Sequence, residues 1–369
     1  MSNLNYGDEK ISQREIFLAV PSMLIAIGIL VFPRNLAENT IAADGWISIL
    51  MSGFIAIMFT WLVAKIASNF PNQPFLKYAS FLVTKPVAML FTFLFVVQGT
   101  LLTAFEVRAI ADVSHTYLFE RTPVQVINFS YLLVVIYAVS GSRAAIFRLN
   151  ALFLPIVLVT TTILLLFSIR FMEFNNVMPM FKTDIKDLGK GVFEGTLSFT
   201  GISILFFYIS LVKNPIKVPK KAVLGMATVV LFYLIIFLTC IAVFGNVQTA
   251  NIRFPFIELA KSVEIPGGFF ERLESIFFVI WTMAIFTTTV MAFDIALFAL
   301  TSIFSKVKKQ TFVFILAPVV YFLTTIPNNS YEIGVMDKIV TYFSLGLSST
   351  VLIVLWMMYI FKGGKQGGK

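Results

Sequence analysis

Two short apolar stretches, about half the chain apart, decide the fold: IFLAVPSMLIAIGILVFP at residues 16–33 and GTLSFTGISILFFYISLV at residues 195–212. Each has 18 residues, close to the number of about 20 that an α-helix needs to cross the hydrocarbon of a bilayer. Each also carries residues near its middle that disfavour a continuous helix, because glycine tolerates unusual backbone angles and serine or threonine hydroxyls satisfy freed backbone groups. These residues are Pro21 and Gly28 in the first stretch and Thr200, Gly201 and Ser203 in the second. We therefore predict two transmembrane helices that are interrupted halfway across the membrane.

An interrupted helix at the midplane exposes backbone N–H and C=O groups, and its broken ends carry opposite partial charges. A small zwitterion such as an amino acid fits a site of this kind. The alternative is that glycine, serine and threonine serve close packing between helices. The matched positions of the two stretches favour the ligand site, because paired interrupted helices are typical of transporters built from inverted repeats.

The composition identifies an all-α integral membrane protein. Hydrophobic residues make up 58% of the chain and charged residues 13%, and the mean hydropathy is +0.90. A soluble chain of 369 residues would leave much of that apolar surface in water. One cysteine, Cys240, and one histidine, His115, supply neither a disulfide framework nor a zinc cluster, so we expect no metal, no cofactor and no enzymatic activity. The charged N-terminus lacks the pattern of a cleavable signal peptide.

About ten apolar stretches are long enough to be transmembrane helices. They are Ile16–Pro33, Gly45–Ala64, Pro86–Phe105, Thr122–Ser142, Asn150–Ile169, Gly195–Val212, Ala222–Phe244, Ser275–Phe304, Thr311–Ile326 and Ile339–Phe361. The third is predicted to continue as one long helix through Glu106 and Arg108. Between the seventh and eighth, Gln248–Gly268 mixes apolar and charged residues and predicts a short extracellular helix or lid.

The charge of +9 is a topology signal. Basic residues concentrate in the loops on one side, which predicts that both termini are cytoplasmic. Anionic headgroups of the lipid bilayer are the expected partner of those loops, and no nucleic acid is needed to explain the charge. Five spans in each half predict a single transmembrane domain, residues 1–369, with inverted repeats at about 14–170 and 189–361.

Other residues at the predicted midplane complete a pocket. At about 1.5 Å per residue, the third span reaches its middle between Gln98 and Leu102, and the eighth reaches it at Thr287, Thr288 and Thr289. The threonines could line the pocket or offer hydroxyls to a cation. Their alternative role is helix packing.

Ionisable residues within the spans are candidates for function. Glu106, Arg108 and Asp112 are expected close to the outer interface, where they form either a structural network or an outer gate, and Arg108 and Asp112 are spaced to pair on one helix face. Asp294 is expected near the cytoplasmic interface. It either pairs with a loop lysine or takes part in a proton relay.

Several short runs occur in an order and spacing that resemble a known family. They are Gly28 with Phe32-Pro33-Arg34, then Asp44-Gly45-Trp46, Phe105-Glu106-Val107-Arg108-Ala109, Glu120-Arg121-Thr122-Pro123-Val124-Gln125-Val126, and Phe270-Glu271-Arg272-Leu273-Glu274-Ser275 followed by Trp281. Over nearly its whole length the chain resembles the B subunits of spore germinant receptors, a spore germination protein family within the amino acid–polyamine–organocation transporter superfamily. The first helix departs from the family's frequent Gly-Ala-Gly-Leu-Leu, because Ala26 stands where the first glycine would be.

The resemblance implies a LeuT-like fold of five plus five helices with discontinuous helices 1 and 6. It implies a receptor that senses a small nutrient germinant, an amino acid, in the inner spore membrane together with a membrane A subunit and a lipoprotein C subunit. It also implies a pocket between helices 1, 3, 6, 8 and 10, which points to Ala26, Leu102, Thr200, Thr288 and Ala292.

Combining both lines gives a set of predicted ligand-binding residues. The set is Ala26, Ile27, Gly28, Gln98, Leu102, Phe199, Thr200, Gly201, Ser203, Thr287, Thr288 and Ala292. The alternative function is an amino-acid permease coupled to protons or sodium. A membrane enzyme is not supported, because no nucleophile–base pair is visible at a shared depth.

Overall fold

The structure is a computed structural model that describes residues 10–262 and 273–362. Within these ranges it consists of α-helices, short 3₁₀ turns and one isolated β-bridge between Ile11 and Val212, so the predicted all-α class is confirmed. Six of the described helices exceed 20 residues. They are α3 (Gly45–Ser68), α5 (Lys85–Tyr117), α7 (Arg143–Ser168), α10 (Val218–Phe244), α13 (Leu273–Ile303) and α15 (Ser330–Phe361).

Ten helical segments account for the ten predicted spans. In the described part of the chain, seven segments are long and apolar enough to cross a membrane, and α1 (Gln13–Leu24) with α2 (Gly28–Ala37) forms a bent pair that makes an eighth. The shorter apolar helices α6 (Val124–Ser140) and α14 (Lys309–Thr325) occupy the fourth and ninth places. The third span is one helix through Glu106 and Arg108, as expected.

The sixth span, Ile185–Leu211, changes character along its length. It consists of α8 (Ile185–Ser198), the 3₁₀ turn η4 (Thr200–Ser203), α9 (Ile204–Tyr208) and the 3₁₀ turn η5 (Ile209–Leu211). A stretch of 3₁₀ structure inside a helix often marks a hinge or a strained sequence. Both predicted interruptions are therefore present.

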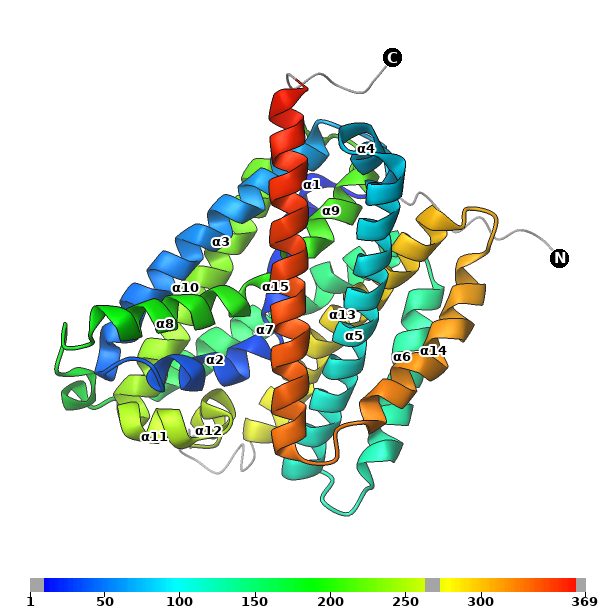
Figure 1. Ribbon diagram of the computed structural model, residues 1–369. Helices are drawn as coiled ribbons and strands as arrows, with labels where there is room; N and C mark the ends of the chain where they lie inside the picture. Colours follow the sequence, from blue (N-terminus) through cyan, green and yellow to red (C-terminus); the bar gives the residue numbers. More distant parts are fainter. Residues whose placement is uncertain (1–9, 263–272, 363–369) are drawn as a thin grey trace.

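The two ends of the helix bundle differ. Figure 1 shows that α1 begins and α15 ends at one end of the bundle, which we call the terminal end, while α11 (Asn246–Asn251) and α12 (Pro255–Ser262) lie at the opposite end. The short helix α4 (Phe75–Leu82) also lies at the terminal end, where Lys362 Nζ donates to the carbonyl of Phe81. The helices α2 and α8, which are the halves of the two broken helices farther from the terminal end, lie side by side (Figure 1). Helix α13 is the most buried span and packs along α5.

Two helices begin nine or more residues earlier than the predicted spans. The sixth begins at Ile185 rather than Gly195, and the tenth begins at Ser330 rather than Ile339. The prediction ended each span at charged residues, but Lys186 and Lys190 are exposed on a helical turn that continues past the apolar part. Charge limits the length of the apolar segment and not the length of the helix.

Asp44 holds the loop before α8 against the start of α3. It ends the 3₁₀ turn η1 (Ala42–Asp44) and is fully buried. Its carboxylate accepts hydrogen bonds from the backbone N–H groups of Phe181, Lys182 and Thr183 at 2.6, 2.8 and 2.9 Å, and from the Thr183 hydroxyl at 2.9 Å. Hydrogen bonds to a charged acceptor are the stronger kind, which gives this aspartate a structural role.

We expect Asp44→Asn to lower the free energy of unfolding by about 2 kcal/mol, because the amide keeps one acceptor oxygen and places an NH₂ group against N–H donors. Thermal unfolding of the purified protein in detergent measures the effect. Asp187→Asn is the matched control, since 47% of the Asp187 side chain is exposed and its ion pair is with the neighbouring Lys190 at 2.7 Å. Equal unfolding midpoints for both variants would show that the loop contact contributes nothing.

Candidate functional site

The first broken helix bends by 55° between α1 and α2. Residues 25–27 join the two pieces, and three backbone carbonyls around the break accept hydrogen bonds from side chains of other helices. Thr288 donates to Ser22 at 2.8 Å, Tyr233 donates to Leu24 at 2.7 Å, and Trp281 Nε1 donates to Ala26 at 3.1 Å. Unpaired carbonyls inside a bilayer cost several kcal/mol each, so these three donors, from α10 and α13, stabilise the break.

Gly28 makes room for one of these donors. A Cβ atom at this position would lie 2.5 Å from the Tyr233 hydroxyl oxygen and 3.6 Å from the ring carbon Cζ. The hydroxyl can therefore reach the Leu24 carbonyl only because residue 28 has no side chain. The hydrogen bond between Tyr233 and Leu24 thus requires a glycine at position 28.

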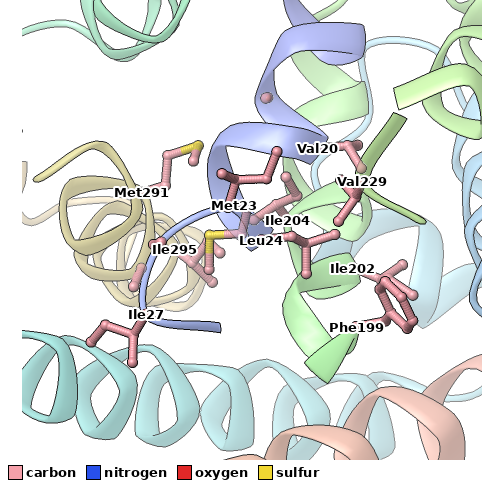
Figure 2. Close-up of a cluster of buried hydrophobic side chains, with 14 of the residues drawn as sticks. Val20, Met23, Leu24, Ile27, Phe199, Ile202, Ile204, Val229, Met291 and Ile295 are labelled. Atoms are coloured by element: carbon pink, nitrogen blue, oxygen red, sulfur yellow. The ribbon is translucent and has the colours of Figure 1, made fainter. Parts of the chain in front are cut away.

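The two interruptions touch each other. A Cβ atom on Gly201 would lie 2.8 Å from Met23 Cγ and 3.0 Å from Leu24 Cδ2. Figure 2 shows Met23, Leu24 and Ile27 around the end of α1, with Ile202 and Phe199 on the sixth helix beside them. The Phe199 ring stacks on Tyr233 with a centroid separation of 5.5 Å, so Tyr233 contacts both broken helices.

A cavity of about 770 Å³ reaches these interruptions from the end opposite the terminal end. Eight of the twelve predicted ligand-binding residues line it, namely Ala26, Ile27, Gly28, Gln98, Leu102, Thr200, Gly201 and Thr288. These residues come from the first, third, sixth and eighth spans. The lining from the tenth span includes Asp337, Thr341 and Ser344, so all five helices of the expected pocket contribute.

The other four predicted residues lie behind the cavity wall. Phe199 packs on Tyr233, and Ser203 accepts a hydrogen bond from Gln98 Nε2 at 3.4 Å. Thr287 donates to the carbonyl of Ala284 in its own helix. Ala292 is fully buried, and its carbonyl oxygen lies 2.7 Å from where Gly99 would carry a Cβ atom, so it packs against α5. These residues support the site from outside it.

Arg108 and Asp112 interact electrostatically, but among the described residues Asp112 forms its ion pair with another partner. Arg108 is buried and donates to the backbone carbonyl of Pro327 at 3.1 Å, whereas Asp112 pairs with Arg253, just before α12. Glu106 and Asp112 line the cavity. The contact with Arg253 ties α5 to the segment before α12, which is a longer-range contact than helical spacing can predict.

The segment Gln248–Gly268, predicted to form a short helix or lid, overlaps two short helices within its described residues 248–262. Both α11 and α12 lie there, and Arg253 and Phe254 between them line the cavity. Tyr117 donates to Glu258 of α12 at 3.0 Å. The last part of the predicted lid, Pro266-Gly267-Gly268, lies outside the described residues, as does part of the run before Trp281.

Between the cavity and the terminal end, a buried carboxylate connects several helices. Asp294 has no exposed side-chain area and pairs with Lys309 at 2.9 Å and Arg143 at 3.2 Å. The Tyr208 hydroxyl donates to it at 3.1 Å. The expected pairing with a lysine is confirmed. The network joins α9 to α13, α7 and α14.

Several functional residues were missed by the sequence analysis. Tyr233 stood inside a continuous apolar run and gave no signal. Asp337 precedes Ile339, the first residue of the predicted tenth span, so the sequence did not place it among the ligand-binding residues. Further lining residues sit at the cavity rim, among them Arg34, Glu38, Glu194, Arg253, Tyr331 and Lys338.

Two broken helices that meet at the end of a cavity are the features of a LeuT-like membrane fold. Two solved structures share the fold. MhsT in complex with L-phenylalanine matches with a TM-score of 0.75 and 16% identity over 97% of this chain and 91% of that one. Mhp1, a nucleobase-cation-symport-1 family transporter in a closed conformation with bromovinylhydantoin bound, matches with a TM-score of 0.71 and 13% identity over 95% and 81%.

Sequence comparison identifies the family within that fold. Residues 10–333 match the family described as "Spore germination protein", and the chain belongs to this family. Spore germination protein GerLB of Bacillus cereus is 41% identical over 100% of this chain and 98% of its own length. Spore germination protein YndE of Bacillus subtilis (strain 168) is 31% identical over 98% of each chain. The resemblance inferred from the short runs is confirmed.

The contact between Gly28 and Tyr233 predicts coupled effects on stability. Tyr233→Phe leaves the Leu24 carbonyl unpaired, and we expect a loss of about 1–3 kcal/mol in the free energy of unfolding. Gly28→Ala should be costly in the wild-type background and less so in the Tyr233→Phe background, where the nearest remaining atom of residue 233 is an ordinary contact distance away. Thermal unfolding of the two single variants and the double variant in detergent measures this coupling, for which we expect about 1 kcal/mol.

Tyr137→Phe is the control for the hydroxyl, because the Tyr137 side chain is 82% exposed. We expect it to leave the unfolding midpoint unchanged. Strictly additive costs of Gly28→Ala and Tyr233→Phe would contradict the steric explanation of Gly28.

Proposed function

We propose that this protein is the nutrient-sensing membrane subunit of a spore germinant receptor and that a small nutrient, an amino acid, binds where the two broken helices meet. The observation that carries the proposal is the cavity, which ends on Ala26, Gly28, Thr200 and Gly201. Membership of the spore germination family supplies the biological context. The solved relative that holds L-phenylalanine supports an amino acid as the ligand class.

The lining suits the two ends of a zwitterion. Helix α2 begins at Gly28 without a side-chain cap, and the N-terminus of a helix favours a carboxylate. The buried Oε1 atom of Gln98 has no hydrogen-bond partner, and the Thr200 hydroxyl also lines the cavity. Both can accept hydrogen bonds from an ammonium group. The remaining lining nearby is apolar, with Leu102 and Ala26, and selects the nutrient side chain by shape.

The basic loops support an orientation with both termini in the cytoplasm. With both termini in the cytoplasm, the cavity opens to the outside, from which a nutrient arrives. We place the protein in the inner membrane of the spore. The A subunit and the C-subunit lipoprotein of the receptor are its proposed partners.

Binding signals only if the nutrient prefers one conformation of the protein over another. The cavity is lined by residues of α1 and α2 from the first broken helix and of α8 and η4 from the sixth. A ligand that contacts Gly28 and Thr200 together therefore changes the packing of the two broken helices against each other. The sixth helix continues through α9 to Tyr208, which donates to Asp294. A shift at the break therefore acts directly on the buried network at the terminal end.

Filling the cavity at the sixth helix should abolish sensing. We expect Thr200→Phe to remove the germination response to the cognate nutrient while protein level stays normal, because the ring occupies the space of the ligand and Thr200 makes no hydrogen bond that holds the fold. Loss of optical density in spore suspensions measures the response. Thr325→Phe, at an exposed position of α14, is the matched control. A normal response in Thr200→Phe spores would show that the nutrient binds elsewhere.

The alternative function is an amino-acid permease, and it is favoured by the transporter fold of the two solved relatives. Uptake distinguishes the two functions. We expect the purified chain in liposomes to bind radiolabelled nutrient without accumulating it, with or without a proton or sodium gradient. Gradient-dependent accumulation above the external concentration would identify a permease instead.

A further inference from the structure

The outer part of the cavity carries an excess of carboxylates. Five acidic residues line the whole cavity, Glu38, Glu106, Asp112, Glu194 and Asp337, against three basic residues, Arg34, Arg253 and Lys338. Arg34 pairs with Glu38 at 2.8 Å, and Arg253 pairs with Asp112. Lys338 is then the remaining basic residue of this lining, against the three remaining carboxylates Glu106, Glu194 and Asp337. Its electrostatic interactions are with Glu194 and Asp337.

Glu106 is the most buried of these carboxylates on the cavity wall. The residue is 5% exposed, it lines the cavity, and its Oε2 atom has no hydrogen-bond partner. Arg108 does not neutralise it, because residues two apart on a helix point to different sides, and the Arg108 guanidinium donates to the Pro327 carbonyl. A buried carboxylate without a partner is costly. A ligand that brings a positive charge into the cavity removes that cost.

Asp337 of α15 lines the same cavity as Glu106, and α15 packs against α5. The two carboxylates interact electrostatically, and counting residues from the terminal end gives depths of about 32 Å for Glu106 along α5 and about 36 Å for Asp337 along α15. The Thr341 hydroxyl donates to Asp337 Oδ1 at 3.1 Å. That contact fixes the side chain and leaves the second oxygen for a ligand.

We propose that Glu106 and Asp337 form a subsite for a primary ammonium group. It lies about 12 Å along α5 from Gln98, on the side away from the terminal end, and so on the path to the inner site. An ammonium group has three N–H donors in a compact cation, and the two carboxylates and their neighbours supply acceptors from two facing helices. A bare metal cation such as Ca²⁺ takes six to eight oxygen ligands, and the described residues contain no group of three or more His, Cys, Asp or Glu that could hold a metal ion.

The subsite is additional to the proposed inner site and does not depend on which nutrient binds there. Carboxylates in a cleft raise the local concentration of cations. A nutrient with an ammonium group is thus drawn into the outer cavity before it reaches the uncharged residues between the broken helices. Compounds that lack a cationic group gain nothing from this step.

Direct binding of a minimal amine tests the subsite. The probe is [¹⁴C]methylammonium, measured by equilibrium dialysis against the purified full-length chain in detergent micelles. We expect saturable binding by the wild type and a loss of affinity of about tenfold or more in both Glu106→Gln and Asp337→Asn, because each removes one charge-assisted hydrogen bond. Asp187→Asn changes a half-exposed carboxylate that is not part of the cavity lining, and it should bind like the wild type.

Three results would overturn the proposal. One is the absence of saturable binding in the wild type, and another is wild-type affinity in either Glu106→Gln or Asp337→Asn. The third is displacement of methylammonium by equimolar sodium or potassium, which would identify an inorganic cation site. The two variants lie on different helices, so a folding defect in one leaves the other informative. Because the assay uses no nutrient, its outcome is separate from that of the Thr200→Phe experiment, and either site can fail alone.

Discussion

The structure depends on how the unpaired backbone carbonyls of a broken helix find hydrogen-bond donors inside the membrane. Water is absent there, so each carbonyl that loses its helical partner needs a donor from the protein. Tyr233 of α10 and Trp281 and Thr288 of α13 supply donors to three alternate carbonyls, those of Leu24, Ala26 and Ser22. The break, the bend of 55° and the cavity behind it exist because these donors are in place. Gly28 belongs to the same arrangement, since its missing side chain gives Tyr233 its path.

The same contacts make the two broken helices one mechanical unit. Tyr233 bonds to the first helix and stacks on Phe199 of the sixth, while Gly201 packs against Met23 and Leu24. The sixth helix then passes through Tyr208 to Asp294, which is buried and paired with cations on two other helices. A ligand at the breaks is thus connected, through a short series of direct contacts, to the end of the bundle that carries the termini. Coupling through such packed contacts needs two arrangements of similar energy, and unwound helix segments are suited to provide them.

Local chemistry explains what the sequence could and could not predict. The two interruptions were predictable because proline, glycine and hydroxyl residues interrupt apolar runs, and depth along a helix placed Gln98, Leu102 and Thr288 on the cavity. Depth does not specify the direction of a side chain, so Thr287 and Ala292 were predicted as well, although they lie behind the wall. The donors to the break could not be found in this way, because Tyr233 and Leu24 are more than 200 residues apart. Asp337 was missed for a related reason: a charged residue ends an apolar segment in sequence, yet it continues a helix when it faces a cavity.

In the proposed function, the charge distribution along the cavity divides recognition into two steps. The outer wall carries an excess of carboxylate charge from α5, α8 and α15, whereas Ala26, Leu102, Thr200 and Thr288, which line the cavity at the breaks, are uncharged. Charge acts over longer distances than shape does, so the outer wall discriminates by charge and the inner wall by fit. Ala26 stands at the inner wall, and its methyl group narrows the space beside the backbone. In the proposed function, selectivity between nutrients that all carry an ammonium group therefore depends on the inner residues.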